Sequence, residues 1–557
     1  MKSPLREKLR PSFATAPALT ICLVFFASVL YYAHKKYLCQ DVTHFDVQRL
    51  VQFFESVRSE GFIDAMNLNP DDWFYYTFEP AQLITIPFYL LAPSAYTLFV
   101  LQAGTLSVAL FFAYLLAAHV SNNRKVGLAA LVACALNPYL WTFALMGWRS
   151  YLITAPFFVA SLYAVEKKNN KLAAVLLALG GLGKVNLMLL SACIGLWIWL
   201  RNPKAKHAKR AFVTCFILLV LIIAAATAIR HRLDLDISTE EMHLSAYGDT
   251  IGKALFTVAT SPLLVMRQIF VDANIAHPAM FLSLLFIPVC AGGYFLCALP
   301  EIGLILLSTS GLTADVFYRN IYPAIYNPNV FVHNNHFYLT GILLACFAVG
   351  LARIYNYFSK NSFGMMNGPY MILSVVFLSF VIRFIWPPMI AGPMPLNIHY
   401  DGRYYRQTAH DKLGWRMAED IPEGAFVRAQ WSLFSKTLMK GHPRLRSFEW
   451  YRNDVVEDYI YVDLFAFEYL MERRQYLSDL ARILKGGRYG VMRFKDGYVL
   501  MKKGGDTGEN LKVLEFIEDN GELLLKNLFR PYRDRALPDP QVGRDVYSKT
   551  QLVGQES

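Results

Sequence analysis

The residues SAYTLFVLQAGTLSVALFFAYLLAA, numbers 94–118, form a continuous apolar run without a charged side chain. A helix needs about 20 such residues to cross the hydrocarbon core of a bilayer. Comparable runs recur along the chain, so we expect a mainly α, polytopic helical membrane protein with about eleven transmembrane helices. The other spans are expected near residues 14–32, 127–146, 150–165, 172–183, 186–200, 211–229, 277–291, 297–312, 337–352 and 369–387.

The composition agrees with a membrane protein. Of the 557 residues, 55% are hydrophobic and only 17% are charged, and the mean hydropathy is +0.31. This balance excludes a disordered or fibrous protein and argues against an ordinary soluble enzyme. A basic N-terminus leads into the first apolar run with no convincing cleavage site, so this run is expected to be an uncleaved anchor.

The net charge of +12 is distributed unevenly along the chain. With the N-terminus inside the cell, the cytoplasmic segments hold 16 basic and 2 acidic residues. The rest of residues 1–387 holds 12 basic and 16 acidic residues, and residues 388–557 hold 26 and 24. Because cytoplasmic loops retain positive charge, this pattern predicts a cytoplasmic N-terminus and an extracytoplasmic C-terminal domain.

Three segments outside the cytoplasm are large enough to hold chemistry: residues 34–93, 230–276 and 388–530. In the first, apolar residues at helical spacing predict an amphipathic helix on the membrane, and AQLITIPFYLLAP (81–93) predicts a second. The third mixes a helix-like stretch, TAHDKLGWRMAEDIP (408–422), with strand-like segments, so a small C-terminal α/β domain is expected. An Asp-Gly pair at 496–497 predicts a hairpin, and residues 531–557 are expected to be disordered.

Two carboxylates are candidates for catalysis. Asp46, near Asp41, begins the first outer loop, and Glu79 in TFEP returns towards the membrane at its end. A carboxylate there can act as a general base on an acceptor hydroxyl or hold a metal beside a leaving phosphate. The structural alternatives are a solvated acid that caps the helix and an interfacial acid before a proline.

Two cations and a histidine are candidates for substrate binding. Lys184 in GGLGKVNLML and Arg149 in MGWRSY fall at the outer ends of apolar hairpins, where they could bind a lipid phosphate or simply reach the headgroups. His336, with His333, enters a late span, but no nearby acid completes a zinc motif, so no metal ligand is assigned. The chain contains no P-loop, HExxH motif or basic-aromatic stretch, which argues against nucleotide-driven transport and nucleic-acid binding.

Several of these segments, taken in order, resemble a bacterial membrane-protein family defined as a domain of unknown function and placed among the GT-C glycosyltransferases. The matching segments are FDVQRLVQF (45–53), TFEPAQLITIPFYLLAPSAYTLFVLQ (77–102), ALNPYLWTFALMGWRSYLITAPFFVASLYAVEKKN (135–169), LGKVNLMLL (182–190), ALPEIGLILLS (298–308), NHFYLTGILLA (335–345), DIPEGAFVRAQ (420–430), YIYVDL (459–464) and DGYVLMKK (496–503).

This resemblance implies a GT-C-like transmembrane domain over residues 1–387 and an outer C-terminal domain. It implies transfer of a sugar from a polyprenyl-phosphate donor to a glycan or lipid acceptor at the outer face of the bacterial inner membrane. Asp46 matches the family's catalytic acid, Lys184 its lysine, and His336 a histidine that opens a late helix.

The chain also departs from the family pattern. Thr77 and Glu79 stand where the family has His and Ser. Trp148, Arg149 and Ser150 stand where it tends to show an Asp and a His, and Val185-Asn186 replaces Glu-Asp. These departures motivate an alternative, a non-catalytic GT-C-fold scaffold or lipid-binding component of an envelope-assembly complex. A transporter is the third hypothesis, but it would need more polar residues within the spans. The cofactor stays open, with a divalent metal as one option.

Overall fold

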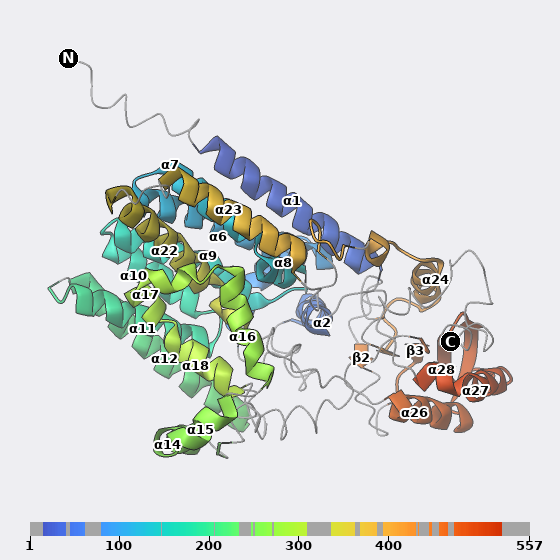
Figure 1. The fold of residues 1–557 in the computed structure, drawn as a ribbon. Helices are drawn as coiled ribbons and strands as arrows, with labels where there is room; N and C mark the ends of the chain where they lie inside the picture. Colours follow the sequence, from blue (N-terminus) through green and yellow to red (C-terminus); the bar gives the residue numbers. More distant parts are fainter. Residues whose placement is uncertain are drawn as a thin grey trace.

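The computed structural model is a bundle of apolar helices with a small α/β domain at one end (Figure 1). The fold is mainly helical, as expected. The structure describes residues 15–39, 45–61, 79–145, 147–204, 206–232, 247–248, 251–269, 272–308, 336–361, 368–386, 394–400, 402–430, 433, 445–447, 456–465 and 473–525.

Four long helices in the described part of the chain can cross a membrane by length and composition. They are α1 (Ala16–Leu38), α6 (Ala95–Ser121), α22 (Thr340–Asn361) and α23 (Gly368–Ile385). The helices α7 (Arg124–Leu136) and α8 (Pro138–Leu145) form one further candidate span, bent by 54°. Pro138 causes this bend, because proline lacks the N–H that would continue the helix.

Further apolar helices correspond to most of the other expected spans. They are the 3-10 helix η1 (Ser150–Thr154), α9 (Ala155–Glu166), α10 (Asn170–Gly181), α11 (Val185–Arg201), α12 (Lys206–Arg232), α17 (Gly293–Leu296) and α18 (Leu299–Ser308). The total of about eleven spans stays a prediction. Apart from α12, which has 27 residues, these helices do not reach the length of a full crossing, and the apolar stretch counted within α12 covers only Phe212–Ala225.

The segment expected as a span at 277–291 is not one helix. The helix α16 (Asp272–Ser283) ends early, Leu285 and Phe286 adopt positive φ angles, and the 3-10 helix η2 (Ile287–Ala291) follows. The backbone of η2 lies against α22, where a Cβ on Gly350 would stand 2.2 Å from the carbonyl oxygen of Ile287. The lack of a side chain at Gly350 therefore permits this close approach.

The centre of the bundle is α6, which packs against α1, α7, α9 and α22. Its side chains are buried on more than one face, among them Ala103, Leu106, Leu110 and Ala113. This explains why the run at 94–118 is apolar around the whole helix rather than amphipathic.

The segment expected as the first outer loop contains the two expected helices, α2 (Phe45–Glu60) and α5 (Ala81–Leu91). The apolar face of α2 is buried at Leu50, Val51, Phe54 and Val57. It packs on α5, where the Phe54 and Tyr89 rings lie 5.2 Å apart. The amphipathic pattern is thus explained by packing between the two helices.

The C-terminal domain contains a five-stranded mixed sheet in the order β2-β1-β3-β5-β4, as expected for an α/β domain. The strands β2, β1 and β3 run parallel, and β5 runs antiparallel to β3 and β4. The elements are α24 (Ala409–Ala418), β1 (Val427–Ala429), β2 (Leu445–Ser447), β3 (Tyr459–Asp463), α26 (Arg473–Lys485), β4 (Tyr489–Lys495), β5 (Tyr498–Lys503), α27 (Asn510–Asp519) and α28 (Gly521–Leu525).

The predicted Asp-Gly hairpin is confirmed between β4 and β5. Both turn residues have positive φ angles, 49° for Asp496 and 78° for Gly497. This is the backbone that a two-residue type I′ turn requires. The expected disordered tail, residues 531–557, lies outside the described residues.

The helix α24 joins the C-terminal domain to the bundle. Gln407, just before the helix, and Trp415 on it both donate hydrogen bonds to the carbonyl oxygen of Leu38, at 3.3 and 3.1 Å. The Trp415 ring also lies 5.6 Å from the ring of Tyr37. The last turn of α1 is therefore completed by side chains from the C-terminal region.

Candidate functional site

Glu79 directly precedes Pro80, the N-cap residue of α5, and is 1% exposed. Its carboxylate accepts hydrogen bonds from the hydroxyl of Ser150 and from Gln82 Nε2, the latter at 3.4 Å. The N-terminus of α5 further favours negative charge at this position. Burying a carboxylate costs free energy unless hydrogen-bond donors surround it. Ser150, Gln82 and the helix N-terminus provide these stabilising groups for Glu79.

Arg149 lies in a non-helical segment that Gln102 of α6 holds in place. Gln102 donates hydrogen bonds to the carbonyl oxygens of Phe143, Ala144 and Gly147, at 2.9, 3.1 and 2.7 Å. Its Oε1 accepts a hydrogen bond from the backbone N–H of Arg149 at 2.8 Å. A polar residue inside an apolar helix thus positions the buried Arg149.

Two tyrosines connect Arg149 to Lys184. Arg149 and Tyr151 share a side-chain hydrogen bond, and the Tyr151 ring lies 4.6 Å from the ring of Tyr338. Lys184, which is 6% exposed, donates a hydrogen bond from Nζ to the Tyr338 hydroxyl at 2.8 Å. Residues from η1, from the start of α11 and from η5 (His336–Leu339) therefore meet in one place.

A second carboxylate lies beside Lys184. Asn186 donates a hydrogen bond from Nδ2 to Glu301 at 2.6 Å, and the positive charge of Lys184 acts on that carboxylate. Glu301 lies in the first turn of α18 and is 2% exposed. We call Glu79, Arg149, Tyr151, Lys184, Asn186, Glu301 and Tyr338 the polar cluster.

Several buried polar atoms of this region have no hydrogen-bond partner among the residues that the structure describes. They are Gln82 Oε1, Trp148 Nε1, Asn186 Oδ1 and Glu301 Oε2. Buried polar atoms normally pair with protein, water or ligand atoms. The described residues therefore leave the hydrogen-bonding capacity of these four atoms unused.

The structure brings together three of the five residues singled out from the sequence: Glu79, Arg149 and Lys184. Asp46 is the second residue of α2, and His336 opens η5 two residues before Tyr338. The side chains of Asp46 and His336 lie outside the described part of the structure, as do Asp41 and His333. The roles expected for these residues stay predictions.

The sequence analysis missed Tyr151, Tyr338 and Glu301. Glu301 carried a usable signal, because an acid within the apolar run ALPEIGLILLS is costly in a membrane and often functional. The two tyrosines carried no comparable signal, since tyrosine is common in this chain, with 32 copies. Within the described ranges, no group of three or more His, Cys, Asp or Glu residues is placed to hold a metal ion.

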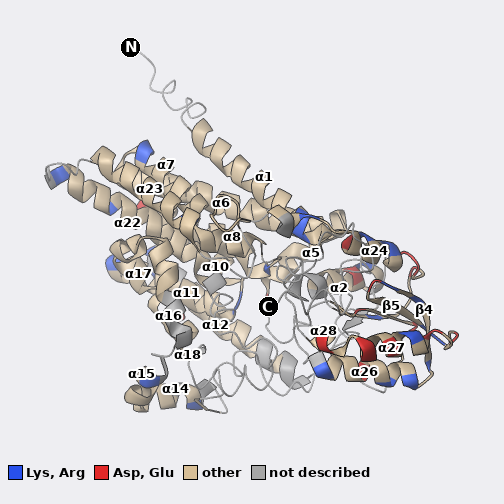
Figure 2. Cartoon of the chain, turned by 45° about the vertical axis from the view of Figure 1, so that its right-hand side comes forward, with Lys and Arg blue, Asp and Glu red and all other residues tan. Residues whose placement is uncertain are grey.

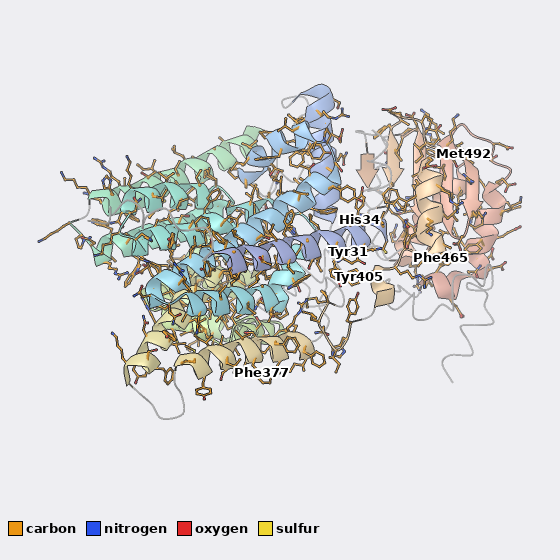
Figure 3. The ribbon with its side chains drawn as sticks, turned by 90° about the horizontal axis from the view of Figure 1, so that it is seen from above. Tyr31, His34, Phe377, Tyr405, Phe465 and Met492 are labelled. Atoms are coloured by element: carbon orange, nitrogen blue, oxygen red, sulfur yellow. The ribbon has the colours of Figure 1, made fainter. Side chains whose placement is uncertain are left out.

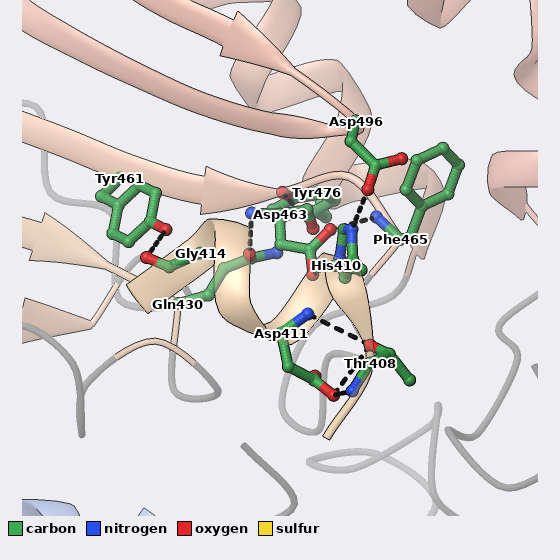
Figure 4. Close-up of polar contacts among 10 residues, drawn as sticks. All are labelled: Thr408, His410, Asp411, Gly414, Gln430, Tyr461, Asp463, Phe465, Tyr476 and Asp496. Atoms are coloured by element: carbon green, nitrogen blue, oxygen red, sulfur yellow. Dashed lines mark hydrogen bonds and ion pairs between the residues drawn. The ribbon is translucent and has the colours of Figure 1, made fainter. Parts of the chain in front are cut away.

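A second polar site lies in the C-terminal domain (Figure 4). His410 of α24 lies 2.9 Å from Asp463 through Nε2 and 2.9 Å from Asp496 through Nδ1. Its ring also stacks on Tyr498, with the ring centres 4.2 Å apart. Both nitrogens can donate to ionised carboxylates only in the imidazolium form. These contacts, which we call the His410 clamp, fasten α24 to β3 and to the β4–β5 turn.

The end of the helix bundle away from the polar cluster has its own polar contacts. Arg201 pairs with Glu166 at 3.4 Å, and the Tyr294 hydroxyl donates to Glu166 at 2.7 Å. Arg201 ends α11 and Lys184 precedes its first residue, so this contact lies about 25 Å from the polar cluster along that helix. The two ends of the bundle therefore carry separate polar groups.

Comparison with known proteins gives one family match. A family model described as "Predicted membrane protein (DUF2079)" matches residues 78–500. This range contains the whole polar cluster and the His410 clamp, and it begins after Asp46. No curated protein matches the chain.

Proposed function

Because the chain belongs to the DUF2079 family of predicted membrane proteins, we propose that it is an integral membrane glycosyltransferase-like protein. The proposed reaction transfers a sugar from a polyprenyl-phosphate donor to an envelope acceptor on the extracytoplasmic face. The observation that carries this proposal is the convergence of Glu79, Arg149 and Lys184 in one buried cluster. Charged groups in an apolar bundle are costly and mark functional sites more often than structural ones.

The cluster offers both kinds of group that the reaction needs. Arg149 and Lys184 would bind the phosphate of the donor, because cationic side chains are the usual phosphate partners. Glu79, together with Asp46, would take the proton of the acceptor hydroxyl as its oxygen attacks the anomeric carbon. The bond from that carbon to the phosphate oxygen breaks, and the polyprenyl phosphate leaves with the electron pair.

The cations also favour the developing charge on the leaving group. A preorganised charge in a site that excludes water typically contributes a few kcal/mol, on the order of 3 kcal/mol, to transition-state stabilisation. Lys184 is already held by Tyr338, so little reorganisation is needed when the phosphate arrives.

The proposed orientation places the N-terminus in the cytoplasm and the polar cluster at the outer side of the bacterial inner membrane. Figure 2 shows Lys and Arg at the ends of α7 and α22 that lie away from the C-terminal sheet, and further Lys and Arg on the C-terminal domain itself. The proposed orientation assigns the first group to the cytoplasmic side. The pairing of Glu166 with Arg201 agrees, because the expected spans place the loops after residues 165 and 200 on the same, cytoplasmic side.

Transfer from a labelled donor tests the proposal. We expect purified protein in liposomes to move sugar from at least one of a panel of radiolabelled undecaprenyl-phosphate sugars to an envelope extract. Glu79→Gln should lower the rate about a hundredfold or more. The matched control is Glu55→Gln, which alters a buried carboxylate of α2 that accepts hydrogen bonds from Tyr89 and Arg58. Equal activity of Glu79→Gln and wild type would reject the role of Glu79.

A second function is lipid-phosphate binding without transfer. It is favoured because residues of the polar cluster already contact one another. Lys184 is bonded to Tyr338 and lies beside Glu301, so its charge is balanced in the absence of substrate. Native mass spectrometry with undecaprenyl phosphate separates the two functions. Binding that is lost in Lys184→Met, with no transfer from any donor, would favour the binding component.

A further inference from the structure

The second outer loop contains a helical hairpin formed by α14 (Ile251–Thr260) and α15 (Pro262–Ile269). It lies at the edge of the bundle in both Figure 1 and Figure 2. We propose that this α14–α15 hairpin lies in the plane of the bilayer interface and binds the surface of a membrane that contains anionic phospholipid. The proposal does not depend on the transferase function.

One face of the hairpin is attached to the bundle. Ala254 of α14 and Val265 of α15 are buried together with Tyr247 and with Leu307 of α18. The turn between the helices is regular. The backbone N–H of Ser261 donates a hydrogen bond to the carbonyl oxygen of Thr257, and Pro262 is the first residue of α15. The hairpin is therefore an ordered element whose orientation is set by an apolar helix of the bundle.

The other face presents large apolar side chains without a cover among the described residues. Phe256 is 70% exposed, Leu263 is 80% exposed and Met266 is 50% exposed. Apolar residues on one side of short helices are typical of segments that insert into the headgroup and acyl boundary. With 10 and 8 residues, the two helices are too short to span a bilayer.

The charges of the hairpin identify the kind of surface that it fits. Lys253 and Arg267 are its only charged residues, both are exposed, and residues 251–269 contain no Asp or Glu. Basic residues beside an apolar face attract anionic headgroups over zwitterionic ones. A soluble protein partner would not explain why the hairpin is attached to α18, an apolar helix of the membrane bundle.

Depth-dependent fluorescence quenching tests the proposal in the full-length protein. Phe256→Cys and Leu263→Cys are made in a Cys290→Ser background, labelled with an environment-sensitive fluorophore, and reconstituted into nanodiscs that contain brominated phospholipid. Two matched controls are Phe377→Cys, on the exposed side of α23, and Met492→Cys, on the C-terminal sheet. Both positions are labelled in Figure 3. We expect quenching at positions 256 and 263 well above that at 492 and strongest with bromine placed near the headgroup end of the acyl chain. Position 377, midway along α23, should be quenched most by bromine placed deep in the bilayer.

The charge component is tested with lipid composition. We expect stronger quenching in discs that contain phosphatidylglycerol than in pure phosphatidylcholine, and we expect Lys253→Glu combined with Arg267→Glu to abolish this difference. Quenching at positions 256 and 263 no greater than at 492 would overturn the proposal. A disulfide between two copies through Cys at position 256, without lipid quenching, would instead assign the face to a second copy of the chain.

Discussion

Lys184 donates a hydrogen bond to the hydroxyl of Tyr338, a residue 154 positions later in the chain, over 2.8 Å. The ammonium nitrogen also lies 5.0 Å from the centre of the same ring. This contact joins the start of α11 to the helix that leads into α22. It keeps a cation in place within a site where water is largely excluded.

Tyr338→Phe tests the strength of this contact. The change keeps the ring and removes one charge-assisted hydrogen bond, which should lower the free energy of unfolding by about 1.5–3 kcal/mol. Thermal unfolding of the detergent-solubilised protein measures the effect. Tyr357→Phe, at an exposed position of α22, is the control and should leave the midpoint unchanged. Equal midpoints for the two variants would mean that the contact contributes nothing.

Gln102→Leu should loosen the segment that carries Arg149. The substitution leaves three carbonyl groups and one N–H without their present partner, at a cost of about 3 kcal/mol or more. Hydrogen exchange should therefore speed up over residues 143–150. Ser107→Ala on the same helix removes only a bond to the carbonyl of Ala103 and should leave that exchange unchanged.

His410→Ala should destabilise the C-terminal domain. The change leaves the carboxylate of Asp463, which is buried, without its cationic partner, and breaking a buried pair costs about 3–5 kcal/mol. Faster hydrogen exchange in β3 and at the β4–β5 turn would report the loss. Asp463→Asn combined with His410→Ala removes the uncompensated charge and should recover part of the stability. If the double variant is no more stable than His410→Ala, the cost does not arise from the buried charge.

Gly350→Ala should lower the thermal midpoint, because the new methyl group would meet the backbone of Ile287. A cost of about 1–3 kcal/mol is typical of an overpacked position. Gly303→Ala in α18 provides the matched control, since nothing lies within 4 Å of a Cβ there. That control should be neutral or raise the midpoint, because alanine favours helices over glycine by about 1 kcal/mol.

Features encoded by local pattern were predictable from the sequence. The uncharged run at 94–118 predicted α6, and Asp496-Gly497 predicted the hairpin because these two residues tolerate the φ angles of its turn. The membrane-protein family was also recognised correctly from the order of short motifs. In each case the signal lies within a few consecutive residues or in their order along the chain.

Features that depend on contacts between distant segments were not predictable. The break at Leu285 and Phe286 follows from the packing of η2 on α22, which the apolar run at 277–291 does not reveal. The polar cluster needs Tyr151 of η1 to pack against Tyr338 of η5, and these two elements lie far apart in the chain. The two cations could be proposed singly, but their connection through two rings is a property of the tertiary fold.

The hydrogen bonds to the carbonyl of Leu38 have a consequence for the timing of synthesis. The first helix leaves the ribosome early, but its last turn is completed by Gln407 and Trp415, residues 369 and 377 positions later. Because the N-terminal part of a chain emerges first, α1 must wait with this end incomplete until most of the protein has been translated. We therefore expect the insertion of α1 to precede its final anchoring, and shortened chains that end before residue 407 to have a loosened C-terminal end of α1.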